Sequence, residues 1–146
     1  MTRRERARQI ALQALYQFDL LGEAFGDELD EFLRESTRDP KVYFFARELA
    51  RGTRGFLVEA DRRITEAAEH WGVDRMATID RNVLRLATYE ICCQEDTPNQ
   101  VVIDQAIELA KRFGTAQSGA FVNGILDKVM RLAEGETGQE CEAPSP

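Results

Sequence analysis

Four arginines gather at the amino terminus, and their type and spacing suit the binding of phosphate groups. They are Arg3, Arg4, Arg6 and Arg8, the arginine arm, with Glu5 as the one acid among them. On a helix Arg4 and Arg8 are i,i+4 neighbours, so we expect them to share a face outside the apolar stripe. A guanidinium binds phosphate through two parallel hydrogen bonds and stacks on bases. The alternative is a solvated helix end, because such a charge cluster alone is a weak motif.

A second candidate anion site lies in the polar turn between Gly114 and Ser118. One predicted helix ends before this turn and another begins after it, and backbone N–H groups at a helix N-terminus attract anions. Lys111 adds positive charge just before the turn. Phe121, in the following helix, can pack inward or stack on an unpaired base, and its periodicity favours packing.

The remaining motifs argue against a catalytic or metal centre. The chain has one histidine, and no HExxH, GxSxG, CxxC or Gly-rich phosphate loop occurs in it. The adjacent Cys92 and Cys93 cannot readily pair with each other, and an odd count of three cysteines suits no disulfide framework. We therefore expect no catalytic residue, no metal, no cofactor and a reduced, cytoplasmic setting.

The charge is distributed unevenly along an acidic chain. The net charge is −7, and eight acids stand between Asp19 and Asp39 against Arg34 and Arg38. The arginine arm is thus a basic end on an acidic body. Local charge decides ligand binding more than the total does, because salt screens exposed charges over about 10 Å.

Apolar residues repeat with a helical period throughout, which predicts a compact all-α bundle of about seven helices. The first helix should end at Leu21-Gly22, and Asp39 should cap a helix with Pro40 in its first turn. A long pattern then continues from Val42 to Ala67 across Gly52 and Gly55, which bend it or admit a close neighbour. The other predicted segments are a short helix at 29–33, helices at 79–91 and 102–113, and a final helix capped by Ser118.

These helices predict one domain over residues 1–133, with Trp71 in its core. The acidic segment 134–146 should be a disordered tail, because it lacks large apolar residues. No apolar run approaches the roughly 20 residues of a membrane span, so we expect no membrane association.

Four segments resemble the NusB transcription antitermination family, in the family's order, between Arg3 and Leu132. They are RQIALQALY at 8–16, DRNVLRLA at 80–87 followed by Tyr89-Glu90, the stretch from Ile103 to Phe113 with AIELAKRFG at 106–114, and FVNGILDK at 121–128. The resemblance implies two small helical subdomains and RNA binding. It implies recognition of a single-stranded boxA-type element of ribosomal RNA leaders together with NusE, a small-subunit ribosomal protein, within an antitermination complex of RNA polymerase.

The resemblance also implies roles for particular positions. The arginine arm and Tyr16 match the family's RNA-binding end, Gln117, Ser118 and Phe121 match its second RNA-contacting region, and Asp80 and Arg81 match the surface near NusE. The sequence departs from the pattern in two places, since Ala120 stands where relatives often have a basic residue, and the turn carries Ala116-Gln117 where they often have an acidic one. These changes act in opposite directions on RNA affinity.

Two other interpretations remain open. The chain could be the NusB-like RNA-binding domain of a larger ribosomal RNA methyltransferase. It could also be a protein-only adaptor that binds a partner in a helix groove, which the net charge of −7 favours. Salt-dependent binding to single-stranded RNA would distinguish an RNA-binding protein from the adaptor.

Overall fold

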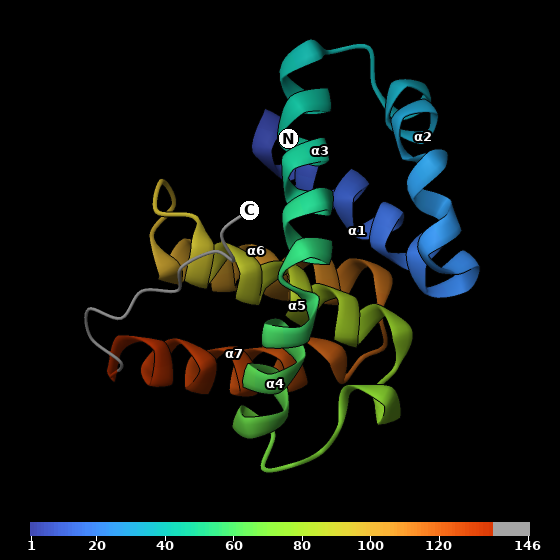
Figure 1. The fold of residues 1–146 in the computed structure, drawn as a ribbon. Helices are drawn as coiled ribbons and strands as arrows, with labels where there is room; N and C mark the ends of the chain where they lie inside the picture. The colour runs from blue at the N-terminus through green and yellow to red at the C-terminus, as the bar shows by residue number, and fades with distance from the viewer. Residues whose placement is uncertain (136–146) are drawn as a thin grey trace.

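The computed structural model describes residues 1–135, which form seven α-helices and two 3-10 turns (Figure 1). They are α1 (Arg3–Leu21), η1 (Gly22–Asp27), α2 (Leu29–Ser36), α3 (Pro40–Gly55), α4 (Leu57–Ala67), η2 (Val73–Arg75), α5 (Thr78–Cys93), α6 (Asn99–Phe113) and α7 (Ser118–Gly135). Within this part of the chain there is no β-strand, so the prediction of an all-α fold is confirmed. Glu134 and Gly135 belong to α7, and the rest of the predicted tail lies outside the described residues.

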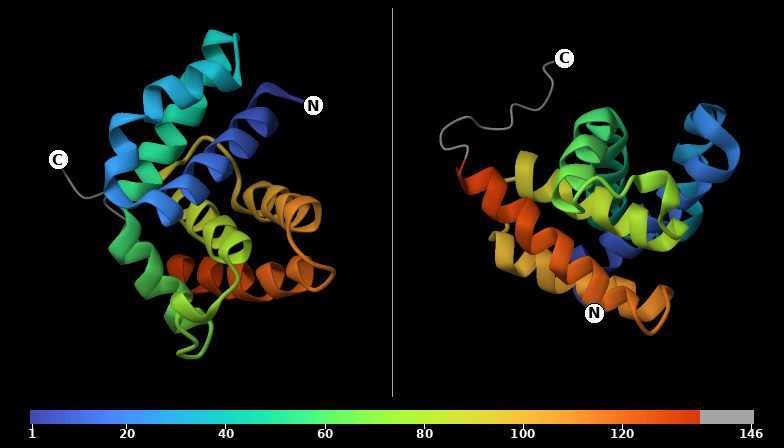
Figure 2. Two further views of the ribbon diagram at one scale, coloured as in Figure 1. Left: turned by 90° about the vertical axis from the view of Figure 1, so that its right-hand side faces the viewer. Right: turned by 90° about the horizontal axis from the view of Figure 1, so that it is seen from below.

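The helices form two groups that meet at α5. In Figures 1 and 2 α1, α2 and α3 lie together on one side, while α4, α6 and α7 surround α5 on the other. The most extensive packing joins α1 to α3 and α6 to α7, and α5 contacts both groups. The central position of α5 explains why ten consecutive residues, 82–91, are buried whatever face of the helix they occupy.

The ends of α1 and the start of α3 follow from local chemistry. The Thr2 hydroxyl accepts a hydrogen bond from the Glu5 N–H, and the Glu5 carboxylate accepts one from the Thr2 N–H, which makes a capping box. Gly22 ends α1 with a φ of 75°, a conformation that favours glycine. Asp39 caps α3 through the Lys41 N–H, with Pro40 as the first helical residue, as predicted.

The long pattern from Val42 to Ala67 is two helices rather than one bent helix. Helical geometry is interrupted at Phe56, whose buried ring lies 6.3 Å from the ring of Tyr89, measured between centroids. Gly52 admits a close neighbour, because a Cβ there would lie 2.1 Å from the Tyr89 hydroxyl. The position of α5 therefore requires both the glycine and the break.

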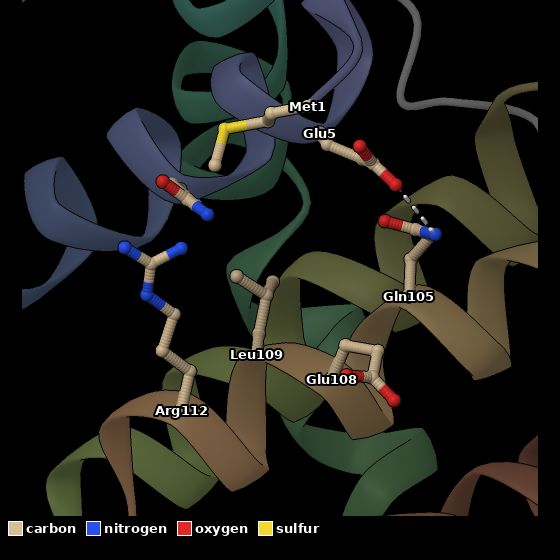
Figure 3. A pocket seen from close by; sticks show the side chains of 7 residues that line it. Met1, Glu5, Gln105, Glu108, Leu109 and Arg112 are labelled. Atoms are coloured by element: carbon tan, nitrogen blue, oxygen red, sulfur yellow. Dashed lines mark hydrogen bonds between the residues drawn. The ribbon is translucent and has the colours of Figure 1, made fainter.

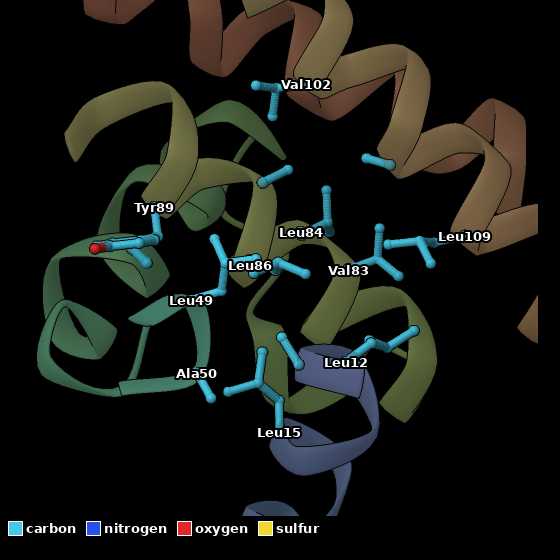
Figure 4. Close-up of a cluster of buried hydrophobic side chains, with 14 of the residues drawn as sticks. Leu12, Leu15, Leu49, Ala50, Val83, Leu84, Leu86, Tyr89, Val102 and Leu109 are labelled. Carbon is cyan, nitrogen blue, oxygen red and sulfur yellow. The ribbon is translucent and has the colours of Figure 1, made fainter. Parts of the chain in front are cut away.

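One continuous core holds the two groups together. Figure 4 shows side chains from α1, α3, α5 and α6 meeting around α5. Those labelled include Leu12, Leu15, Leu49, Ala50, Val83, Leu84, Leu86, Val102 and Leu109. Burying one large aliphatic side chain stabilises a fold by about 1.5–3 kcal/mol, so this cluster fixes how α1 sits against α5 and α6.

The prediction that Trp71 lies in the core is wrong, because this side chain is 47% exposed. The chain leaves α4 through Glu69 and His70, both with left-handed backbone at φ 54° and 72°, and this turn directs Trp71 outward. There the Arg75 guanidinium lies 5.7 Å from the centre of the indole. None of the described helices is long and apolar enough to cross a membrane.

Candidate nucleic-acid interface

Three arginines of the arm are at least partly exposed, and each is oriented by one or two oxygen atoms. Arg3 Nε is 2.8 Å from Asp39 Oδ2, and Arg4 Nη2 is 2.7 Å from Asp96 Oδ2. Arg6 donates to the Ser36 carbonyl oxygen at 3.2 Å. Exposed ion pairs contribute at most about 1 kcal/mol, so a phosphate can displace or share these partners.

Arg8 is different, and the expectation that it shares an open face with Arg4 is wrong. Its guanidinium donates two hydrogen bonds to the Glu90 carboxylate, at 2.8 and 2.9 Å, and the two side chains are only 6% and 3% exposed. Arg4 and Arg8 do point to the same side of α1, but α5 covers that side only as far as Cys93. Arg4 therefore reaches Asp96 in the loop after α5, whereas Arg8 is enclosed against α5 itself. We assign Arg8 to the structure of the bundle rather than to a ligand.

A groove of about 230 Å³ lies between the N-terminal part of α1 and α6 (Figure 3). Glu5 and Gln9 of α1 line one side, while Gln105, Glu108 and Arg112 of α6 line the other. The Gln105 amide donates to Glu5 across it at 3.4 Å, and the Thr2 backbone hydrogen bond holds the pKa of Glu5 below its ordinary value. The groove is thus of mixed charge, with Arg112 facing two acids.

Tyr16 lies on the same face of α1 as this groove. It follows Gln9 by seven residues, which is close to two helical turns, and its side chain is 37% exposed. Arg112 immediately follows Lys111 and precedes the polar turn. The groove is therefore bounded by the face of α1 on which Tyr16 is exposed and by Arg112 of α6. The arginines of the arm do not line it and lie on the adjoining faces of α1, where they contact Asp39, Asp96 and Ser36.

The turn before α7 is fixed by its own hydroxyl groups. Ser118 is buried, and its Oγ accepts a hydrogen bond from the Thr115 N–H at 2.9 Å. Ser118 is the first residue of α7 rather than a residue before it, so the predicted capping position is shifted by one. Its hydroxyl shapes the turn and is not presented to solvent.

The neighbours of Ser118 are more accessible. Lys111 and Gln117 are exposed, and the stem of Lys111 lies against Gly119, where a Cβ would be 3.2 Å from Lys111 Cγ. Phe121 is half-buried and packs against the core, as its periodicity indicated. Lys111 and Gln117 are the groups of this region that a ligand can reach without rearrangement.

Asp80 and Arg81, predicted for a partner surface, lie at the start of α5 beside a network that sequence reasoning missed. Arg81 Nε is 3.0 Å from Asp19 Oδ2 of α1, and one oxygen of the half-buried Asp80 carboxylate has no hydrogen-bond partner among the described residues. Behind Arg81, the buried Arg85 makes two hydrogen bonds to Asp61 and a third to Asp19. No local pattern indicated Asp19 or Asp61, because more than 20 residues separate each from Arg85.

We expect this network to make stability depend on acid pH through Asp19. Burial alone would raise the pKa of Asp19, but hydrogen bonds from Asn82 and Arg81 and the charge of Arg85 together lower it below its ordinary value. A folded pKa below the unfolded value means that the stabilisation is complete above about pH 4 and is lost as pH falls toward the folded pKa. Asp19→Asn should therefore lose less stability than the wild type between about pH 5 and pH 2.5 (urea unfolding monitored by circular dichroism). If the free energy of unfolding falls equally with pH in Asp19→Asn and in the wild type, Asp19 is not the group responsible.

Comparison with known proteins decides the family. The model of the NusB family matches residues 5–131.

The chain belongs to the NusB family.

The relatives are similar over most of their length. The transcription antitermination protein NusB of Anaeromyxobacter dehalogenans is 46% identical over 129 residues, which are 88% of this chain and 90% of that protein. The structure of T. maritima NusB matches with a TM-score of 0.76 at 40% identity, covering 90% of this chain and 92% of that one. A crystal structure of the antitermination factors NusB and NusE in complex with double-stranded RNA matches with a TM-score of 0.81 at 28% identity, over 90% and 98%.

The segments that resemble NusB fall on the elements that build the groove and its surroundings. The first runs along α1 from Arg8 to Tyr16, and the third along α6 into Phe113, so these two form the walls of the groove. The second lies on α5 and contains Asp80, Arg81, Arg85 and Glu90. The fourth lies on α7. Much of what makes the sequence resemble NusB therefore serves the packing of α1, α5 and α6.

Proposed function

We propose that this chain is a transcription antitermination factor that binds a boxA-type single-stranded RNA of ribosomal RNA leaders. It acts in the cytoplasm with a NusE-type ribosomal protein, within an RNA polymerase complex, and without catalysis of its own. The observation that carries the proposal is the likeness, over nine tenths of the chain, to a NusB captured with NusE and RNA.

The surface supports RNA as the ligand despite the net charge of −7. Arg3, Arg4 and Arg6 form a basic end of α1 next to the residues that line the groove, and Tyr16 is exposed further along the same helix. Lys111 and Gln117 stand near its other side. Base stacking on an aromatic side chain together with phosphate contacts to cations is the usual chemistry of single-strand recognition. We infer that these six residues contact RNA and that Arg8 and Ser118 position them.

The proposal also covers the extent of the RNA-binding domain and the surface that contacts the partner. Residues 1–133 act as one RNA-binding domain, and the half-buried Asp80 with Arg81 contributes to the surface for the NusE-type partner. Arg81 supports the second part, because its side chain remains partly exposed where it pairs with Asp19 at the start of α5.

The arm is tested by the salt dependence of RNA binding. Replacing both Arg4 and Arg6 with alanine should weaken binding and reduce the slope of log K against log [salt] by about 0.7 for each phosphate that the variant no longer binds. Fluorescence anisotropy with a boxA-like single strand, from about 50 to 200 mM salt, measures both quantities. The same sequence as a duplex shows whether the single strand is preferred.

Arg131→Ala is the matched control, because it removes the same kind of charge from an exposed position near the end of α7. It should leave the slope unchanged. If the wild type binds no single-stranded RNA, alone or with the partner, the RNA-binding function is excluded and a protein-only adaptor becomes the better account.

A further inference from the structure

A hollow of about 390 Å³ lies at the corner where α2 ends and α3 begins, away from the groove beside α6. It is lined by Arg34, Thr37, Arg38, Asp39, Tyr43 and Phe44, among others. Its volume falls within the range of about 300–1,000 Å³ that small-ligand sites occupy. The hollow is therefore large enough to hold one small ligand or one compact part of a larger ligand.

An aromatic ring is exposed at this hollow and held beside a second ring. Phe44 is 60% exposed, and its centroid lies 5.2 Å from that of Tyr43 in an edge-to-face arrangement. Tyr43 is itself fixed, because its hydroxyl donates to Asp30 and the Arg34 guanidinium lies 5.1 Å from its ring centre. The fixed Tyr43 ring thus supports Phe44, which is left open to a ligand.

The hollow carries free positive charge. Arg38 lines the hollow and is exposed, and Lys41, the residue after the lining Pro40, is also exposed. Neither side chain makes an ion pair with another described residue. Two nearby acids are already engaged, since Asp30 is paired with Arg34 and Asp39 with Arg3. An exposed ring with unpaired cations complements a ligand that has both a flat apolar face and a negative charge.

The arginine arm adjoins this corner. Arg3 reaches Asp39, which lines the hollow, and Arg6 donates to the Ser36 carbonyl oxygen at the end of α2. Figure 1 likewise shows the α2–α3 connection at the end of the molecule where α1 begins. A strand held by Arg3 can therefore reach the hollow across the Arg3–Asp39 pair.

From these observations we propose that the hollow is a subsite for one nucleotide of single-stranded RNA, beyond the part of the strand bound by the arm. The base stacks on Phe44, and its phosphate lies beside Arg38, with Lys41 adding positive charge at the start of α3. The inference rests on the proposed RNA-binding function and extends it: the bound strand turns over the α2–α3 corner rather than ending at the arm.

The test compares RNAs of two lengths on the full chain. One is a boxA-like core, and the others carry three additional uridines at the 5′ or the 3′ end. A further pair carries the same extensions as abasic nucleotides, which keep the phosphates but cannot stack. We expect one uridine extension to tighten binding by about fivefold or more, and its abasic counterpart to retain only the smaller gain from phosphate contacts.

Phe44→Ala should abolish the gain from bases while leaving core affinity unchanged, and Arg38→Ala should lower the salt slope only for the extended RNA. Val58→Ala and Arg131→Ala are the controls, because Val58 is 86% exposed on α4 and Arg131 lies on α7. If the core binds but no extension tightens binding, or the gain survives Phe44→Ala, the subsite is excluded and the proposed function stands. If no RNA binds, both are excluded.

Discussion

Replacing Arg8 with alanine is expected to lower the free energy of unfolding by about 3–5 kcal/mol. The reason is that the change leaves Glu90, only 3% exposed, without the two hydrogen bonds that Arg8 donates to its carboxylate. A buried charge without a partner costs far more than an ion pair contributes. Chemical unfolding followed by circular dichroism at neutral pH measures the difference directly.

Two further variants show whether the loss of stability comes from breaking the buried Arg8–Glu90 pair or from removing any arginine of the arm. Arg4→Ala, one turn earlier, breaks an exposed ion pair with Asp96 and should cost less than about 1 kcal/mol. The double variant Arg8→Met with Glu90→Met removes both charges and keeps similar volume, so it should recover most of the stability. Equal stability of Arg8→Ala and Arg4→Ala would show that Arg8 is not enclosed by α5. The result also matters for function, because weak RNA binding by an Arg8 variant would report a damaged bundle rather than a missing phosphate interaction.

RNA and the NusE-type partner are expected to bind this chain with positive coupling of about 1–3 kcal/mol, which is roughly 5- to 150-fold in affinity. Outside the arm and the α2–α3 corner the body is acidic, and the groove beside α6 has mixed charge, so the chain alone offers few phosphate contacts. A basic ribosomal protein at the surface around Asp80 and Arg81 would extend the positive track. It would then hold the same RNA at a second place and raise the effective concentration for both contacts.

The coupling can be measured on the affinity of either ligand. Linkage requires RNA to raise the affinity for the partner by the same factor by which the partner raises the affinity for RNA. Calorimetric titration of the partner into the chain, with and without saturating boxA-like RNA, gives one factor. Titration of RNA with and without the partner gives the other. Asp80→Asn removes the charge of a predicted partner contact and should weaken partner binding without changing RNA binding by the chain alone. Partner affinities that are equal with and without RNA would eliminate cooperative assembly and favour the protein-only adaptor.

The helices themselves could be predicted from the sequence, because each depends on neighbours in the chain. The apolar period located the stripes of α1, α5, α6 and α7, and Gly22, Asp39 and Gly114 marked ends that local backbone geometry determines. The order of four short segments was enough to indicate the family that the comparisons confirm. The basic end and the polar turn were also visible, since both are contiguous stretches.

The burial of individual polar side chains depended on the tertiary structure. Arg4 and Arg8 are equivalent in type and helical position, yet only Arg8 is enclosed, because α5 ends before it can cover Arg4. Asp19 joins Arg81 and Arg85 across more than 60 residues, and Trp71 is exposed because two left-handed residues turn the chain outward. Periodicity tells which face of a helix is apolar, whereas the length and position of the neighbouring helix decide which charged residue at the edge of that face is left for a ligand.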